Sequence, residues 1–298
     1  MAKPVIGFVG VGLMGHGMAK NIVEKGYALR IVGNRNRTPV EDLVGRGAVE
    51  AATPRDLAAA CDIVLLCVTD SATVEKIVRG PDGLTAGARP GLIVVDCSTA
   101  DPNSTLALEA ELGRMGITFC DAPLSRTPKD AWEGTLDVMV GADDATFETI
   151  EPVLATFAGR IVRVGAVGNG HKIKLLNNFV AMTYAAVYSE AFTLAKKIGI
   201  EPQALDSVLR GGRMDRGFYQ TFTKYLLDRD VNAHRFTIRN AHKDLRYVSG
   251  LATASGVANW IGAAARNYYA TAEATGHGDD NVPQLSDVIA GLNGTRLG

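Results

Sequence analysis

Apolar residues recur at helical spacing over one long stretch, from Asn169 to Gly199. This spacing predicts a single helix of about seven turns, and Gly199 is the residue type that commonly ends a helix in a left-handed conformation. A second apolar stripe on the other flank indicates burial on more than one side. A small domain could not cover so long an apolar helix, so we expect it to join two domains and to support a homodimer or homotetramer. The first stripe consists of Ile173, Leu176, Val180, Thr183/Tyr184, Val187, Ala191, Leu194 and Ile198.

The first half of the chain alternates short β-branched runs with helical patterns. Such runs are typical of a parallel sheet that helices cover on both faces. The predicted helices include Gly12–Lys25, Ser71–Val78 and Asn103–Arg114. The predicted strands, all placed in one sheet, are Pro4–Gly10, Ala28–Gly33, Ile63–Val68, Leu92–Asp96, Ile117–Cys120, Leu136–Val140 and Ile161–Val164.

The second half shows helical patterns and no convincing strand. We therefore expect an α/β domain over residues 1–165 and an all-α domain over residues 166–298, beginning with the long helix. The further predicted helices are Gln203–Arg210, Phe218–Asp228, Ala241–Ala254, Trp260–Ala274 and Pro283–Leu292.

A glycine-rich segment, Gly10-Val11-Gly12-Leu13-Met14-Gly15, lies between the first predicted strand and helix. In this G-x-G-x-x-G pattern the first two glycines allow a tight turn and close approach of the backbone to a pyrophosphate. The third lets helix and strand pack closely, and the helix N-terminus offers N–H groups to the anion. Because the strand and helix contexts are both present, we predict a Rossmann-like domain that binds a dinucleotide through Gly10, Gly12, Leu13, Met14 and Gly15.

The end of the second predicted strand distinguishes the two nicotinamide cofactors. NAD sites usually place an acid there, whereas a 2′-phosphate needs cationic or neutral donors. The chain reads Gly33-Asn34-Arg35-Asn36-Arg37-Thr38, with no acid before Glu41. We therefore predict NADP in preference to NAD, with Asn34 and with Arg35 or Arg37 near the phosphate. The alternative is a solvated turn that happens to contain arginines.

Three polar residues near the start of the long helix are candidates for the chemistry. Lys174, Asn177 and Asn178 are spaced so that their side chains share one face. Burial and the positive end of the helix dipole both disfavour a charged lysine, so Lys174 is suited to exchange a proton. The asparagine amides can hold a hydroxyl or carbonyl oxygen. The alternative is an ordinary lysine that reaches solvent beside local caps.

Composition narrows the classes of partner. The 298 residues are 47% hydrophobic and 21% charged, with a net charge of −1, and basic residues are not clustered, so we expect neither nucleic acid nor a membrane as partner. We read a cytoplasmic protein, because the N-terminus has no leader pattern and no apolar run is long enough to span a bilayer. The four cysteines and five histidines show no metal-binding spacing.

Six ordered segments together resemble the β-hydroxyacid dehydrogenase family, which includes 3-hydroxyisobutyrate dehydrogenases, tartronate semialdehyde reductases and glyoxylate/succinic semialdehyde reductases. The resemblance spans nearly the whole chain. The segments are GFVGVGLMGHGMAKN, VTDSATVEKIVRGPDG, VVDCSTADP, DAPLSRTPKDAWEGTLDVMVGA, GNGHKIKLLNN and HKDL.

The resemblance implies roles for individual residues. Lys174 matches the catalytic lysine, and Asn178, with Asn177 beside it, matches the amides that hold the reacting oxygen. Ser125 matches a serine in the loop that receives the substrate carboxylate. The residues that match cofactor contacts are Val68, Thr69, Thr99 and, from the second domain, Lys243. The implied reaction is hydride transfer between the nicotinamide and a small β-hydroxy acid or its semialdehyde, with Lys174 as general acid and base.

The substrate loop departs from the family pattern. The usual D-A-P-V-S-G-G becomes DAPLSRT, so Arg126 and Thr127 replace two glycines. As in members resembling sulfolactaldehyde reductase, Arg126 could meet a sulfonate or a second carboxylate, or it could point outward. The alternatives to the main interpretation are therefore a sulfonate or dianionic semialdehyde reductase and a non-catalytic dinucleotide-binding sensor. Reduction of an imine is disfavoured by Lys174.

Overall fold

The computed structural model describes residues 3–298, and its chain divides into two compact units, which meet in the sequence between Lys174 and Leu175. We call them the N-terminal unit and the helical unit. The boundary at 165/166 that we expect from the sequence stays a prediction. Within residues 3–298, no helix combines the length and apolar character that a membrane span requires.

A six-stranded parallel sheet forms the centre of the N-terminal unit, in the order β3-β2-β1-β4-β5-β6. The register is continuous between β1 and β4, where Ile6 pairs with Ile63 and Val9 with Leu66. The apolar runs of the sequence form these strands because both faces of the sheet are buried. The strands are β1 (Ile6–Val9), β2 (Leu29–Val32), β3 (Val49–Ala51), β4 (Ile63–Leu66), β5 (Ile93–Asp96) and β6 (Thr118–Asp121).

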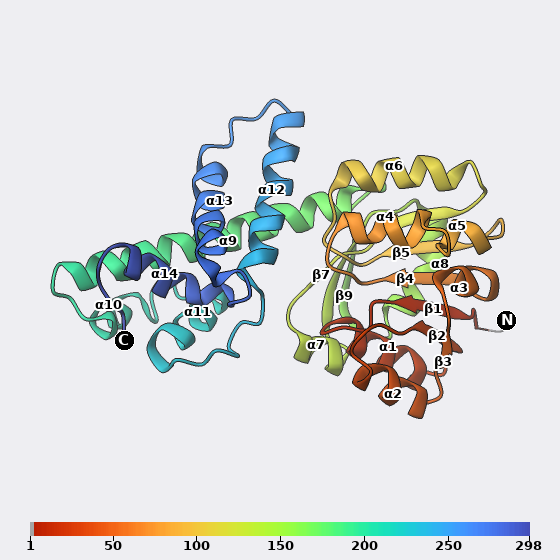
Figure 1. The fold of residues 1–298 in the computed structure, drawn as a ribbon, viewed down its shortest axis with the longest axis horizontal. Coiled ribbons are helices and arrows are strands. Elements are labelled where there is room, and N and C mark those ends of the chain that lie inside the picture. Colours follow the sequence, from red (N-terminus) through yellow and green to blue (C-terminus); the bar gives the residue numbers. More distant parts are fainter. Residues whose placement is uncertain (1–2) are drawn as a thin grey trace. The chain divides into compact units, whose positions relative to one another are not determined.

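Helices cover the two faces of this sheet, as Figure 1 shows. Alternate strand residues divide between two cores. Phe8 and Leu65 join one core with residues of α1 and α8, and Val64 and Phe119 join the other with residues of α3, α4 and α6. The helices of this unit are α1 (Gly15–Glu24), α2 (Thr38–Gly45), α3 (Pro54–Ala60), α4 (Ser71–Arg79), α5 (Leu84–Gly87), α6 (Pro102–Gly113), α7 (Pro128–Glu133) and α8 (Asp144–Leu154).

The prediction of a single sheet is wrong for the last strands. β8 (Leu136–Val140) lies in a separate three-stranded sheet, antiparallel to β7 (Leu124–Ser125) and parallel to β9 (Ala158–Arg163). Only an isolated bridge between Asp121 and Gly141 links β6 to this segment. Pro123 follows two residues later and has no N–H to continue a ladder. β3 was not predicted, because its first two residues are exposed and give no apolar run.

The long helix is confirmed as α9 (Asn169–Lys197), and Gly199 has a positive φ of 83°. The second apolar stripe consists of Phe179, Ala181, Ala185, Tyr188 and Phe192; the last three are buried and the first two are partly buried. The expectation that the helix is buried on more than one side is wrong for the chain by itself. Large side chains of the first stripe are exposed, namely Ile173, Leu176, Val180, Tyr184, Val187, Leu194 and Ile198.

The helical unit packs its helices around one core that includes Phe192, Phe222 and Tyr269. The predicted helices are present with small shifts of their ends. A π-helical turn at Glu273–His277 follows α13, and a 3₁₀ turn at Val282–Gln284 precedes α14. The helices after α9 are α10 (Pro202–Leu209), α11 (Gly217–Asp228), α12 (Ile238–Ala254), α13 (Trp260–Ala272) and α14 (Leu285–Leu292).

Candidate functional site

The strand order has a switch point between β1 and β4. From β1 the chain proceeds outward to β2 and β3, and then crosses back to β4, on the other side of β1. Open parallel sheets bind ligands at such a switch point. The glycine-rich segment follows β1, and Val68 and Thr69 follow β4, so the fold brings these two predicted cofactor segments to neighbouring strand ends.

The glycine-rich segment has the geometry of a phosphate loop. Gly10 has φ 102°, and a Cβ there would lie 2.1 Å from the Cys67 carbonyl oxygen; at Gly15 a Cβ would lie 2.0 Å from the Gly10 carbonyl oxygen. At Gly12 a Cβ would meet no atom within 4 Å, so this part of the loop faces open space. The first turn of α1 carries no acidic residue. The loop therefore fits a pyrophosphate held by backbone N–H groups at the helix N-terminus.

The polar residues in the turn after β2 differ in their side-chain partners. Asn34 and Arg35 are exposed, whereas Arg37 makes a bidentate ion pair with Glu50, at 2.8 and 2.7 Å. This hydrogen bond raises the pKa of Arg37 and lowers that of Glu50. Glu50 was not predicted from the sequence to lie near this turn, because it comes from β3, where it pairs in register with Ile31 of β2.

The turns after β4 and β5 are tied together. The backbone N–H of Val68 donates to the hydroxyl of Ser98 at 3.0 Å, and the Ser98 N–H donates to Asp96 at 2.9 Å. Ser98 is buried, Thr99 is half-buried and Thr69 is exposed. The structure thus places Val68, Thr69 and Thr99 at the ends of adjacent strands. Ser98 was missed, although it stands beside Thr99 in the segment DCST.

The predicted substrate loop, DAPLSRT, runs from Asp121 at the end of β6 through β7 to Thr127, which precedes α7. Ser125 is half-buried in β7, and Arg126 is exposed, with φ 85°. The Arg126 Nε lies 3.0 Å from an Asp137 oxygen and its Nη1 lies 4.0 Å from Asp130. Thr127 caps α7: its hydroxyl accepts from the N–H of Asp130, whose carboxylate accepts from the N–H of Thr127. Both carboxylates therefore already hold the Arg126 guanidinium, and the hydroxyl of Thr127 serves the helix start.

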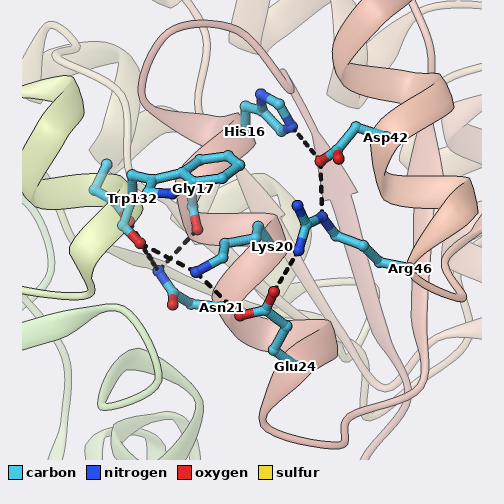
Figure 2. Close-up of polar contacts among 9 residues, drawn as sticks. His16, Gly17, Lys20, Asn21, Glu24, Asp42, Arg46 and Trp132 are labelled. Atoms are coloured by element: carbon cyan, nitrogen blue, oxygen red, sulfur yellow. Dashed lines mark hydrogen bonds and ion pairs between the residues drawn. The ribbon is translucent and has the colours of Figure 1, made fainter.

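Close packing attaches α7 to α1, the helix of the glycine-rich loop. A Cβ at Gly17 would lie 2.6 Å from the backbone of α7 at Ala131 and Trp132. Figure 2 shows the Asn21 amide between the two helices, where it donates to the carbonyl oxygens of Gly17 and Ala131 at 2.9 Å. Lys20 lies over the Trp132 ring, 5.0 Å from its centroid. The loop that carries Ser125 is thus fixed to the helix that follows the phosphate loop.

Lys174 lies in the second turn of α9 and is half-buried. Three residues earlier, His171 is fully buried, with its Nδ1 2.7 Å from the Thr105 hydroxyl. Its ring nitrogens face Asp96 and Asp121, each at 3.8 Å. Asp96, Asp121 and His171 were not predicted as site residues from the sequence, because they lie far apart along the chain.

Asn177 and Asn178 of α9 belong to the helical unit. Asn178 is buried and donates from its side-chain amide to Asp244 at 2.6 Å, while the amide of exposed Asn177 donates to Asn178 at 3.3 Å. Lys243 lies 3.0 Å from the second oxygen of Asp244 and over the ring of Tyr247. Asp244 is 1% exposed. The segment HKDL therefore supplies the carboxylate that orients Asn178, which the sequence reasoning overlooked.

The fold and the phosphate loop define a dinucleotide-binding protein of the Rossmann type. Residues 5–165 match the NAD binding domain of 6-phosphogluconate dehydrogenase, and residues 168–289 match the NAD-binding domain of NADP-dependent 3-hydroxyisobutyrate dehydrogenase. The chain belongs to the β-hydroxyacid dehydrogenase family.

Three relatives illustrate the similarity. The 2-(hydroxymethyl)glutarate dehydrogenase of Eubacterium barkeri is 34% identical over 84% of this chain and 82% of its own. The 3-sulfolactaldehyde reductase of Escherichia coli K12 is 30% identical over 92% and 91%. The solved 3-hydroxyisobutyrate dehydrogenase of Mycobacterium tuberculosis, with L-serine, is 27% identical, with a TM-score of 0.85 over 97% and 99%.

Proposed function

We propose that the protein catalyses reversible hydride transfer between NADP(H) and a small β-hydroxy acid or its semialdehyde. The observation that carries this proposal is the polar start of α9. Lys174 and Asn178 are one helical turn apart, and the buried carboxylate of Asp244 fixes the amide of Asn178. The names of the relatives, which are dehydrogenases and reductases of small acids and aldehydes, support the same substrate class.

The residues of this chain divide the work. The bound cofactor supplies or accepts the hydride at the nicotinamide. In reduction, Lys174 donates a proton to the substrate oxygen as negative charge develops there, and in oxidation it accepts that proton. Asn178 holds this oxygen with Asn177 beside it, and Ser125 receives the substrate carboxylate. Lys243 reaches the cofactor.

The test is the variant Lys174→Ala. General acid–base catalysis contributes roughly 10²- to 10⁴-fold, so kcat should fall by about that factor while affinity for NADPH stays the same. Lys172→Ala is the matched control, because Lys172 lies on the same turn and bonds to Asn169. Near-normal turnover in Lys174→Ala would remove the lysine from the mechanism. A wild type inactive on a whole panel of semialdehydes would instead favour the non-catalytic sensor.

Arg126 is our candidate for recognising a second anionic group on the substrate. A non-glycine residue with positive φ costs free energy, and such residues cluster at binding sites. Two of the relatives are named for a glutarate and for a sulfolactaldehyde. Wild type and Arg126→Gly should be compared on mono- and dianionic semialdehydes. We expect the glycine variant to lose about tenfold or more on dianions only, since a charge-assisted hydrogen bond contributes about 1.5–3 kcal/mol; an unchanged ranking would contradict the proposal.

We infer a preference for NADPH over NADH from the turn after β2. Arg35 is exposed there, and Arg37 neutralises Glu50, the one acid that β3 brings close to Gly33. Arg35→Ala should weaken NADPH binding by about tenfold and leave NADH binding nearly unchanged, because only NADPH carries the 2′-phosphate. Fluorescence titration with both cofactors measures this, and a wild type that prefers NADH would refute the assignment.

We also propose that α9 is the subunit interface of a homodimer or homotetramer. Its exposed stripe includes Leu176, Val180, Val187 and Leu194, each between 49% and 62% exposed. Monomeric proteins rarely expose so continuous an apolar surface. Sedimentation of wild type and Val187→Glu tests this, and a monomeric wild type at micromolar concentration would contradict it.

A further inference from the structure

The start of α9 is held by a carboxylate from a distant strand. Asp121 ends β6 and is 0% exposed. Its Oδ1 accepts a hydrogen bond from the N–H of Gly168 at 2.6 Å, and its Oδ2 accepts one from the N–H of His171 at 2.7 Å. The first N–H groups of a helix have no partner within the helix. Asp121 therefore serves as the cap of α9, although it lies about fifty residues earlier in the chain.

The contact leaves no room for movement. A Cβ at Gly170 would lie 2.4 Å from the Met139 carbonyl oxygen and 2.8 Å from Asp121 Oδ2. A Cβ at Gly141 would lie 2.4 Å from Asp121 Oδ1. The backbone of α9 thus touches β8 directly, with the carboxylate between the two glycines. A shift of the helix start by even an ångström would break both hydrogen bonds or cause a clash.

Burial disfavours the negative charge of Asp121, whereas its hydrogen-bond partners favour that charge. Burial raises the pKa of this carboxyl group, and Asp96 adds to the rise, while His171 and the two backbone N–H donors oppose it. Both oxygens accept N–H hydrogen bonds, which is the pattern of an ionised carboxylate. An anion is favourable at a helix N-terminus, and a buried charge kept with these specific partners is often a functional feature.

Asp121 is also the first residue of the predicted substrate loop. Ser125 lies four residues after Asp121, and Lys174 lies three residues after His171, about one helical turn. One side chain therefore joins the beginning of the substrate loop to the beginning of the helix that carries the proposed acid–base group.

We propose that Asp121 is a positioning residue that sets the place of Lys174 relative to the substrate loop. This inference rests on the proposed function. Asp121 touches neither substrate nor cofactor in this role; it acts through the backbone of α9. Replacing one carboxylate oxygen by an amide turns an acceptor into a donor, which then faces the N–H of Gly168 or of His171.

The test compares Asp121→Asn with Asp143→Asn. Asp143 caps α8 in the same unit, and its carboxylate accepts from the N–H of Thr146 at 2.7 Å, so the control makes the same chemical change at another helix start. A misplaced catalytic group costs up to about 100-fold. We expect Asp121→Asn to lower kcat by about 10- to 100-fold with the dissociation constant of NADPH within about twofold, and Asp143→Asn to keep the wild-type kcat.

A double variant separates positioning from a general loss of structure. If Asp121 acts through Lys174, then Asp121→Asn combined with Lys174→Ala should turn over within about threefold of Lys174→Ala alone. A full further loss in the double variant, or a wild-type kcat in folded Asp121→Asn, would overturn the inference. Retained turnover in Lys174→Ala would instead refute the proposed function, so the two failures are distinct.

If Asp121→Asn does not fold, hydrogen exchange on the wild type tests the inference instead. The amides of Gly168 and His171 should exchange as slowly as those in the middle of α9, because a buried acceptor holds each of them. Rapid exchange at both amides would show that the carboxylate does not hold the helix start in solution, and would overturn the inference.

Discussion

Each unit contains a buried aspartate that accepts hydrogen bonds from the first part of α9 or the residue just before it, but the two aspartates bind different kinds of group. In the N-terminal unit, Asp121 accepts hydrogen bonds from two backbone N–H groups. In the helical unit, Asp244 accepts from the side-chain amide of Asn178 and pairs with Lys243. The first arrangement fixes where the helix begins, whichever side chains it carries. The second fixes the orientation of one side chain.

This difference predicts different tolerance to substitution. A backbone anchor acts on every residue of the first turns, so its loss displaces the helix start. A side-chain anchor acts on one amide and one ammonium group, so its loss leaves the helix in place and unpairs buried groups.

Thiol labelling separates the units most strongly, because all four cysteines lie in the N-terminal unit. Burial raises the pKa of Cys61 to about 11 and that of Cys67 to about 12, and the thiolate is the reactive form. We expect iodoacetamide at pH 8 to label the native protein at least about 10³-fold more slowly than the protein in urea, given the usual stability of a domain. Rapid native labelling would show that the N-terminal unit opens readily.

The same thiols predict a dependence of stability on pH. In the unfolded chain these cysteines ionise near pH 8.5, whereas in the folded unit they stay neutral to higher pH. The contribution of each thiol to the free energy of unfolding is therefore complete below pH 8.5 and is lost as the pH rises towards 11. The helical unit has no cysteine, and its buried Tyr225, with a pKa raised by burial to about 12, begins to matter only near pH 10. Hydrogen exchange at pH 9 should therefore accelerate in the N-terminal unit first.

Asp244→Ala should destabilise the helical unit by about 3 kcal/mol, because it leaves buried polar groups without their partner. Asp244→Asn is the matched control: its amide oxygen can still accept from Asn178, while its amide nitrogen, a donor, replaces the charged oxygen that faces Lys243. Urea denaturation measures both variants. Equal losses of stability in the two variants would mean that the hydrogen bond to Asn178 contributes little to stability. Asp244 would then differ from Asp121 in acting mainly through its charge.

Each unit also contains one arginine with positive φ, Arg126 at 85° and Arg229 at 59°. Arg126→Gly should raise the free energy of unfolding by up to about 1 kcal/mol, because relief of the left-handed backbone exceeds the loss of an exposed ion pair. Arg229 ends α11 and makes a half-buried pair with Asp287, so Arg229→Gly should give no gain. Thermal denaturation checks both, with Arg126→Ala as the variant that loses the pair and keeps the strain.

The sequence predicts the local elements well and the distant pairings poorly. The apolar runs of β1, β2, β4, β5 and β6, and the glycines between β1 and α1, carry local information that determines their structure. The split of the sheet after β6 depends on the bridge between Asp121 and Gly141, and the place of Glu50 depends on the short, exposed β3. Neither leaves a periodic signal in the chain.

The candidate site divides along the same line. Lys174, Asn178 and Lys243 stand in compact motifs, and the resemblance of these motifs to the family predicts their roles. Asp121 and Asp244 also stand in quoted segments, but their partners lie at sequence separations of 50 and 66 residues. A pattern of residue types cannot say which oxygen accepts from which N–H, and those pairings require the folded backbone.

The capping box of α7 separates the start of that helix from the residue at position 126. Thr127 and Asp130 hold the start of this helix by themselves, and Asn21 holds its far end to α1. Position 126 lies just outside that box, and Arg126 adds to it an ion pair with Asp130 at 4.0 Å. A smaller side chain at position 126 would therefore leave the first turn of α7 hydrogen-bonded as before.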